Sequence, residues 1–394
     1  MARHAVPDFP PPTLIADTDA LTALCRRLSG EEFVTVDTEF MRERTYYPEL
    51  CVVQLAGEHE VAVVDAMSDR IDLAALGELL ADRAVPKVFH AARQDVEIFV
   101  QKYGAVPWPM FDTQIAAMVA GFGDQVGYDA LVSGLTGGTI DKAHRFSDWA
   151  ARPLSAARIT YAAADVTWLR LVYRRLRARL EEEGRLAWVA EEMAILHEPA
   201  TYRTDPETAW ERLKLRGNNR RFLALVRALA AWREQEAQRI NIPRQRLLKD
   251  DTLMEIAAIA PTTPEALSRA RGISRGFAEG RTGASLLEAV AAPIALPEAS
   301  LPSVPKQRDS ARPSAALVQL LKVLLAARCE ENQVAPRLIA SSDDIDRIAA
   351  EDAPDVPALH GWRREVFGDD AIALREGRVA LGVEGRRIRL IPVQ

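Results

Sequence analysis

The sequence is poor in cysteine, in long apolar runs and in excess positive charge. Its three cysteines, Cys25, Cys51 and Cys329, are far apart and form no CxxC pair, which excludes a disulfide framework or zinc knuckle and favours a reducing compartment. No uncharged run reaches the roughly 18–20 residues that cross a bilayer, and the segment before Asp17 contains no signal-peptide-like stretch. We therefore expect a cytoplasmic protein with no membrane role.

Common catalytic motifs are also missing. There is no GxxxxGK[ST] phosphate loop, no GxSxG elbow and no HExxH zinc motif. Gly121 and Gly123 lack the third glycine of a dinucleotide-binding fingerprint. With 50 basic and 56 acidic side chains the net charge is −6, so any contact with nucleic acid must depend on a local patch.

The 394 residues divide into three zones and a linker. Residues 1–204 mix short β-rich runs with helical segments, which predicts an α/β domain with a mixed sheet flanked by helices. Residues 205–291 and 314–394 show helical periodicity, the latter as far as an alternating run at 386–391, and predict two all-α domains, which we interpret as diverged copies of one module. Residues 292–313 contain five prolines and predict a linker.

The second zone carries the only concentrated positive charge. Residues 211–249 contain eleven Lys or Arg against three Glu. This segment is either a solvated helical face or an electrostatic footprint for a phosphate backbone. On the second interpretation the candidate RNA-binding residues are Arg220, Arg221, Arg227 and Trp232. Core packing is the alternative role for Trp210 and Trp232.

Carboxylates occur in unusual places. Asp37 and Glu39 end an apolar strand at a spacing of two, so both side chains project to one face of the sheet. Two like charges repel unless a cation lies between them, although solvated acids at a strand end are the simpler alternative. Asp95 begins a predicted helix, where an acid is ordinarily a capping residue.

A third group lies on a long helix predicted over residues 155–183. Tyr161 and Asp165 are four residues apart and share a helical face, and the three residues between them are alanines that let a substrate approach closely. Four carboxylates suit hard divalent ions such as Mg²⁺ or Mn²⁺, and two such ions about 3.5–4 Å apart can activate water against a phosphodiester. A tyrosine hydroxyl can orient that water but is too weak a base to deprotonate it.

Together these residues resemble the three motifs of the DEDD exonuclease superfamily. Tyr161 stands four residues before Asp165, while the position where the histidine-bearing branch has its histidine is Thr160, so the resemblance is to the tyrosine-bearing branch. The flanking sequence is similar to the ribonuclease D family. That likeness is carried by residues 36–42, His90-Ala91 before Asp95, residues 111–114, Asp141-Lys142 through Asp148-Trp149, and Arg152-Pro153-Leu154.

The second zone resembles a helicase-and-RNase-D C-terminal (HRDC) domain, and the last zone resembles a divergent second copy. The residues that carry this likeness include Trp210, Ala231-Trp232-Arg233, Asn241-Ile242-Pro243 and Gly361-Trp362-Arg363. The resemblance implies a ribonuclease-H-like fold and two-metal, 3′-to-5′ hydrolysis that releases 5′-mononucleotides from structured RNA, notably tRNA precursors.

Carried over residue by residue, the resemblance implies metal ligands and one water-orienting group. The implied ligands of the two divalent ions are Asp37, Glu39, Asp95 and Asp165, and the implied water-orienting residue is Tyr161. Asp112 is expected to be structural. A DNA-directed 3′ exonuclease for repair uses the same residues, and a non-catalytic RNA-binding scaffold is the alternative from another class. Nothing in the sequence requires more than a monomer.

Overall fold

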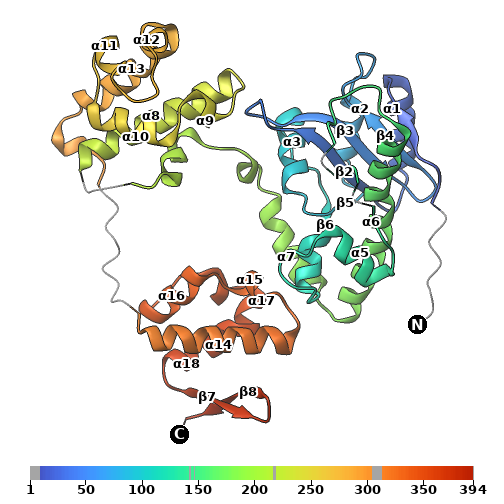
Figure 1. Ribbon diagram of the computed structural model, residues 1–394. Coiled ribbons are helices and arrows are strands. Elements are labelled where there is room, and N and C mark those ends of the chain that lie inside the picture. The colour runs from blue at the N-terminus through green and yellow to red at the C-terminus, as the bar shows by residue number, and fades with distance from the viewer. Residues whose placement is uncertain (1–8, 142, 146, 216–218, 304–312, 394) are drawn as a thin grey trace.

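The amino-terminal domain is built on a six-stranded mixed sheet. The computed structural model describes residues 9–141, 143–145, 147–215, 219–303 and 313–393. The strands are β1 (Thr13–Ile15), β2 (Val34–Met41), β3 (Glu49–Ala56), β4 (Val61–Asp65), β5 (Lys87–Phe89) and β6 (Met110–Asp112). They lie in the order β1-β4-β3-β2-β5-β6, with β2, β3 and β4 antiparallel and the other pairs parallel (Figure 1). The predicted mixed sheet is confirmed. The edge strands β1 and β6 are not predicted, because three residues are too few to show the two-residue period of a strand.

Helices cover both faces of this sheet. They are α1 (Thr18–Leu28), α2 (Ala74–Ala81), α3 (Arg93–Tyr103), α4 (Thr113–Val119), α5 (Tyr128–Thr136), α6 (Ala156–Glu182) and α7 (Leu186–Leu196). Val34 and Val36 of β2 pack in the core with α1, α2 and α3, whereas α6 packs against the opposite face of β3 and β4. Because side chains alternate along a strand, Asp37 and Glu39 face α6.

The turn η1 (Pro199–Tyr202) follows α7 and packs on α3 and α7. A first helical domain comes next. Its elements are η2 (Pro206–Arg212), α8 (Arg220–Arg239), α9 (Arg244–Leu247), α10 (Asp250–Ile259), α11 (Pro264–Leu267), α12 (Arg275–Glu279), α13 (Arg281–Ala295) and η3 (Glu298–Ser300). The linker expected from residue 292 begins later, because α13 runs on to Ala295 and Leu301 is buried. Residues 304–312 of that expected linker lie outside the described residues.

The carboxy-terminal domain is helical for most of its length. Its helices are α14 (Ala315–Asn332), α15 (Pro336–Ile339), α16 (Ser342–Ala350), η4 (Pro357–Leu359), α17 (Gly361–Arg363), a π-helical turn η5 (Arg364–Gly368) and α18 (Asp369–Arg375). The expectation of an all-α domain is wrong at its end, where β7 (Val379–Glu384) and β8 (Arg387–Pro392) form a hairpin. Gly385 adopts a positive φ of 62° in the turn, which glycine permits at no steric cost.

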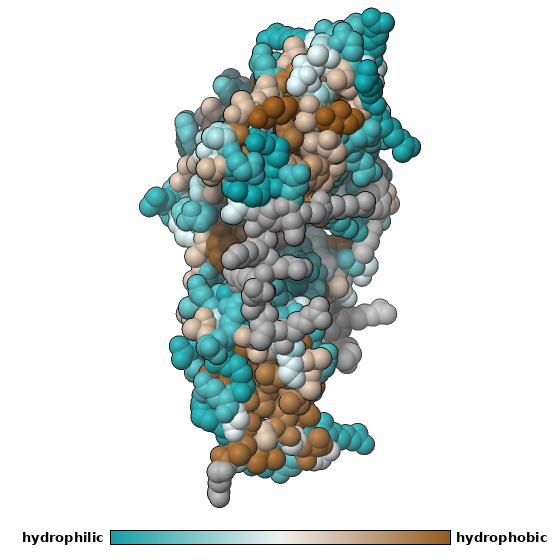
Figure 2. Space-filling view, turned by 90° about the vertical axis from the view of Figure 1, so that its left-hand side faces the viewer, coloured by the Kyte–Doolittle hydropathy of each residue, from teal (hydrophilic) through white to brown (hydrophobic). Residues whose placement is uncertain are grey.

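The hairpin carries exposed apolar side chains. Val383, Ile388, Ile391 and Val393 are between 37% and 75% exposed. Figure 2 shows apolar side chains gathered at this end of the molecule. In the parts of the chain that the structure describes, no helix has the length and hydropathy of a membrane span.

The carboxy-terminal domain docks on α7 through a buried contact. The rings of Trp188 and Trp362 stack with centroids 4.6 Å apart. The indole Nε1 of Trp362 donates to Glu192 Oε1 at 3.1 Å, and the guanidinium of Arg363 forms ion pairs with both Glu192 and Glu191. Arg363 and Glu192 are 8% and 6% exposed, so this ion pair lies in a low-dielectric contact.

Candidate active site

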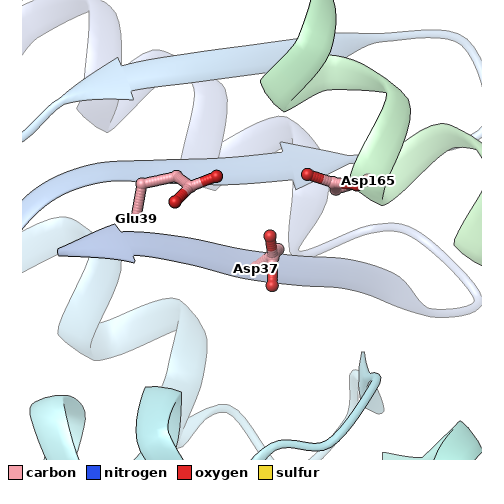
Figure 3. Close-up of side chains that lie close together, drawn as sticks. All are labelled: Asp37, Glu39 and Asp165. Carbon is pink, nitrogen blue, oxygen red and sulfur yellow. The ribbon is translucent and has the colours of Figure 1, made fainter. Parts of the chain in front are cut away.

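Three of the predicted acids meet between β2 and α6. The carboxylates of Asp37, Glu39 and Asp165 each place an oxygen within 4.8 Å of the others (Figure 3). Asp37 and Glu39 come from alternate positions of β2, and Asp165 comes from the helix that covers that face of the sheet. A spacing of two on a strand therefore produces the paired acids that the sequence predicts.

The fourth acid, Asp95, lies beside this group but is held differently. It is in the first turn of α3, is 6% exposed and accepts a hydrogen bond from the Thr38 hydroxyl. It is not one of the three acids whose oxygens lie within 4.8 Å of one another. Asp112 fixes the start of α3, because its carboxylate accepts from the backbone N–H groups of Ala91 (3.0 Å) and Ala92 (2.8 Å). The structural role expected for Asp112 is confirmed.

The electrostatics of the cluster favour a cation. Burial, followed by the charges of Asp37, Asp165 and Asp95, raises the pKa of Glu39 to about 9. Burial is also the largest cause that raises the pKa of each of the three aspartates. Without a compensating charge such a site binds protons, and a divalent cation replaces those protons. An all-oxygen donor set fits Mg²⁺ or Mn²⁺.

Tyr161 lies one helical turn before Asp165 and lines the same pocket. Burial raises the pKa of its hydroxyl well above the ordinary value, and the nearby charges of Asp165 and Glu39 act in the same direction. The phenol therefore keeps its proton at neutral pH. It can orient a water molecule by hydrogen bonding but cannot act as a base, as the sequence analysis infers.

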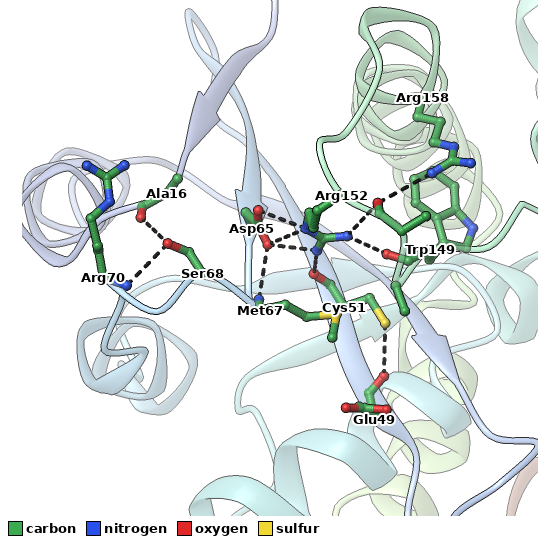
Figure 4. Close-up of polar contacts among 12 residues, drawn as sticks. Ala16, Glu49, Cys51, Asp65, Met67, Ser68, Arg70, Trp149, Arg152 and Arg158 are labelled. Carbon is green, nitrogen blue, oxygen red and sulfur yellow. Dashed lines mark hydrogen bonds and ion pairs between the residues drawn. The ribbon is translucent and has the colours of Figure 1, made fainter.

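The segment before α6 is anchored to the sheet through Arg152 (Figure 4). The guanidinium binds the carboxylate of Asp65 at 2.7 Å and donates to the carbonyls of Cys51 (2.9 Å) and Trp149 (2.6 Å). The ring of Trp149 contacts Tyr161 at a centroid distance of 6.0 Å. Arg152 thus fixes the entry to the helix that carries Tyr161 and Asp165.

The pocket around the acids has a volume of about 290 Å³ and includes residues that sequence reasoning did not assign to the site. Its walls are Asp37, Thr38, Glu39, His90, Tyr128, Arg145, Tyr161, Asp165 and Leu169. Arg145 lies within the 141–149 segment that carries the family resemblance, which is the one sequence signal that pointed to it. Lys142 of that segment lies outside the described residues.

His90 lines the pocket and contacts Thr113. The Thr113 hydroxyl donates to the carbonyl of Phe89 at 2.9 Å and lies 3.0 Å from His90 Nδ1. The other ring nitrogen, Nε2, is buried and has no hydrogen-bond partner among the described residues.

Of the residues of α8 predicted to bind RNA, Arg220, Arg221 and Trp232 have partners within the first helical domain, and Arg227 is exposed. Trp232 is 7% exposed and donates from Nε1 to Ser285 Oγ at 2.9 Å, so its ring is not placed to stack on a base. Arg220 and Arg221 donate to carbonyls of residues 293–302, and Arg227 lies over the Trp210 ring. Core packing, the alternative role for both tryptophans, describes these contacts better.

Comparison with known proteins gives two domain matches and several relatives. Residues 12–181 match the 3′-5′ exonuclease family, and residues 222–290 match the HRDC domain. Proteins named ribonuclease D from Granulibacter bethesdensis and Acidiphilium cryptum are each 66% identical, covering 99% and 98% of both chains. The crystal structure of Escherichia coli RNase D, described as an exoribonuclease involved in structured RNA processing, matches with a TM-score of 0.78 at 28% identity. That match covers 93% of this chain and 98% of the other.

Proposed function

The chain belongs to the ribonuclease D family and is a 3′-5′ exoribonuclease, and from this premise we propose that its acid-lined pocket is a two-metal hydrolytic centre. The proposed ligands are Asp37, Glu39, Asp95 and Asp165. The observation that carries the proposal is the convergence of three half-buried carboxylates whose oxygens lie within 4.8 Å of one another. When bound, Mg²⁺ or Mn²⁺ supplies Lewis acidity to the phosphodiester and lowers the pKa of attacking water.

The remaining residues of the pocket position the reactants. Tyr161 keeps its proton and orients the attacking water through its hydroxyl. Arg145 adds a positive side chain to a wall otherwise dominated by acids and attracts the substrate phosphate. These groups act by orientation and charge, which supply most of the catalysis in phosphoryl chemistry.

The proposed substrates are tRNA precursors with 3′ extensions, shortened by release of 5′-mononucleotides. The description of the E. coli relative, which processes structured RNA, supports this class. We further propose that the protein acts as a monomer in the cytoplasm, and its three buried, free cysteines suit a reducing compartment. We propose that 1–204 is the exonuclease domain and 314–394 a second HRDC-like domain. The first helical domain begins at 205 and extends beyond the limit of 291 expected from the sequence, because α13 continues to Ala295.

A tRNA precursor labelled at its 5′ end tests the proposal. With Mg²⁺ or Mn²⁺ we expect a ladder that shortens from the 3′ end and stops near the mature terminus, and EDTA should abolish it. Shortening of single-stranded DNA but not of RNA would instead favour a repair exonuclease. Binding without shortening of either polymer would favour the scaffold.

A further inference from the structure

A second and larger cavity lies between the exonuclease domain and the first helical domain. Its volume is about 640 Å³. The β2–β3 loop reaches α8 and α9 here (Figure 1). The Tyr46 hydroxyl donates to Glu234, and the backbone N–H of Tyr47 donates to Asn241 Oδ1 at 3.1 Å. These contacts hold the two domains together on one side of the cavity.

The walls of this cavity are rich in positive charge. They include four arginines and one acid: Arg42, Arg203, Arg212, Arg244 and Glu97. Arg42 forms a bidentate pair with Glu97 at 2.9 and 2.7 Å. Among the described residues, Arg203 and Arg212 have no side-chain hydrogen bond or ion pair, and both are exposed. Two unpaired guanidinium groups in one cavity of a protein with net charge −6 favour an anionic ligand.

The cavity also offers aromatic surface. The rings of Tyr46 and Tyr47 lie 4.8 Å apart at 76°, and Tyr202 lines the same walls. Tyrosine rings beside arginines are the combination that binds single-stranded nucleic acid, because bases stack on the rings while the cations neutralise phosphates. An acidic peptide would use the arginines but gain little from the rings.

The elements that carry the catalytic acids lead directly to this cavity. On β2, Glu39 precedes Arg42 by three residues, a distance of about 10 Å along an extended chain. On α3, Asp95 is followed by Glu97 and Gln101, which line the cavity. A polymer whose 3′ end lies at the acids therefore meets the cavity within a few nucleotides.

We propose that this cavity binds the single-stranded RNA segment a few nucleotides upstream of the 3′ end. Arg203 and Arg212 bind consecutive phosphates, and Tyr47 stacks on a base. This inference rests on the proposed function, since it takes the acid pocket as the position of the 3′ end. On this proposal the first helical domain contacts the RNA through Arg212, which lies before α8, and not through the cations of α8.

Direct binding in EDTA tests the cavity without requiring hydrolysis. The probe is a single-stranded oligoribonucleotide of about 12 nucleotides, labelled at its 5′ end and followed by fluorescence anisotropy. In the double variant Arg203→Ala/Arg212→Ala we expect the dissociation constant to rise about tenfold and the salt slope to fall by about 1.4. In Tyr47→Leu we expect weaker binding with an unchanged salt slope, because stacking is lost and no charge is removed.

The matched control is Arg269→Ala/Arg271→Ala. Like the cavity variant, it removes two positive charges, but from exposed positions of the first helical domain that lie outside the cavity. Equal weakening by both double variants, or none by the cavity variant, would overturn the proposal. A cavity effect in a protein that hydrolyses no RNA would refute the proposed function and leave the cavity site standing. Normal hydrolysis with no cavity effect would refute the cavity alone.

Discussion

The hydroxyl of Thr38 donates a hydrogen bond to the carboxylate of Asp95. This contact joins β2 to α3 and so connects two of the three motifs that contribute acids. On β2, Thr38 lies directly between the two acids Asp37 and Glu39. The orientation of Asp95 is therefore set from the same strand that supplies two of the proposed metal ligands.

Replacing Thr38 by valine tests the importance of this contact. Thr38→Val keeps the shape but removes the donor, which leaves the buried Asp95 carboxylate without this partner. Loss of a hydrogen bond that orients a ligand typically costs about 10–100-fold in metal affinity or activity. We expect the Mn²⁺ concentration that gives half-maximal RNA shortening to rise by such a factor, as measured by titrating Mn²⁺ in the hydrolysis assay.

The control is Thr22→Val, which removes a hydroxyl that donates to Thr18 O within α1, far from the acids. Its metal requirement should match that of the wild type. An unchanged requirement in Thr38→Val would show that Asp95 is oriented without this hydroxyl.

Tyr161→Phe separates orientation of water from metal binding. The variant keeps the ring that packs near Trp149 but lacks the hydroxyl. We expect kcat to fall by about 10²-fold or more while Mn²⁺ affinity changes little, because the carboxylates remain. Single-turnover hydrolysis and calorimetric Mn²⁺ titration measure the two quantities. A large loss of Mn²⁺ affinity would show that the hydroxyl supports the metal site itself.

The stability of the metal-free protein should decrease as pH rises. The pKa of Glu39 is raised from 4.5 to about 9 in the folded protein, so between these values the folded state binds more protons than the unfolded state. By linkage the free energy of unfolding then falls with increasing pH. Because the proton of Glu39 is lost over this range, thermal melts in EDTA should show a lower Tm at about pH 8 than at about pH 6.

Mn²⁺ should raise Tm more at the higher pH, because fewer protons compete with it there. Glu39→Gln removes one titrating group of the cluster and should reduce the pH dependence of the metal-free protein, while the raised pKa of Asp37 leaves part of it. A wild-type Mn²⁺ effect that is equal at both pH values would contradict the coupling between protons and metal.

The contact between α7 and the carboxy-terminal domain should depend on Glu192. Glu192→Ala leaves the buried guanidinium of Arg363 without its closest partner, and breaking a buried pair costs about 3–5 kcal/mol. We expect the carboxy-terminal domain to separate or unfold at lower urea concentration, followed by the fluorescence of Trp362. Glu384→Ala breaks an exposed pair with Arg389 and should cost at most about 1 kcal/mol.

Local periodicity predicts the acids well. The alternation of β2 places Asp37 and Glu39 on one face, and the four-residue spacing of α6 places Tyr161 and Asp165 on another, so each pair follows from one element. The contacts that arrange these pairs are not local. Arg152 and Asp65, for example, are 87 residues apart in sequence. No spacing rule connects them.

Segment charge is a weaker guide than periodicity. The positive charge of residues 211–249 predicts an RNA-binding face on α8, but a charge count does not say which way each side chain points. Arg220 and Arg221 turn toward backbone carbonyls of the same domain, and Trp232 enters its core. Arg203 and Arg212, which form no side-chain hydrogen bond or ion pair with the described residues, lie before α8 and line the cavity that the two domains enclose.

The most direct test of the central claim is the hydrolysis of a labelled RNA by Asp165→Asn. This change keeps the size of the side chain and removes one charge from the carboxylate cluster. We expect the single-turnover rate with Mg²⁺ to fall by about 10³-fold or more, while RNA affinity in EDTA stays close to that of the wild type. Asp37→Ala should behave in the same way. Turnover close to the wild-type rate in either variant would show that the acid cluster is not the catalytic centre.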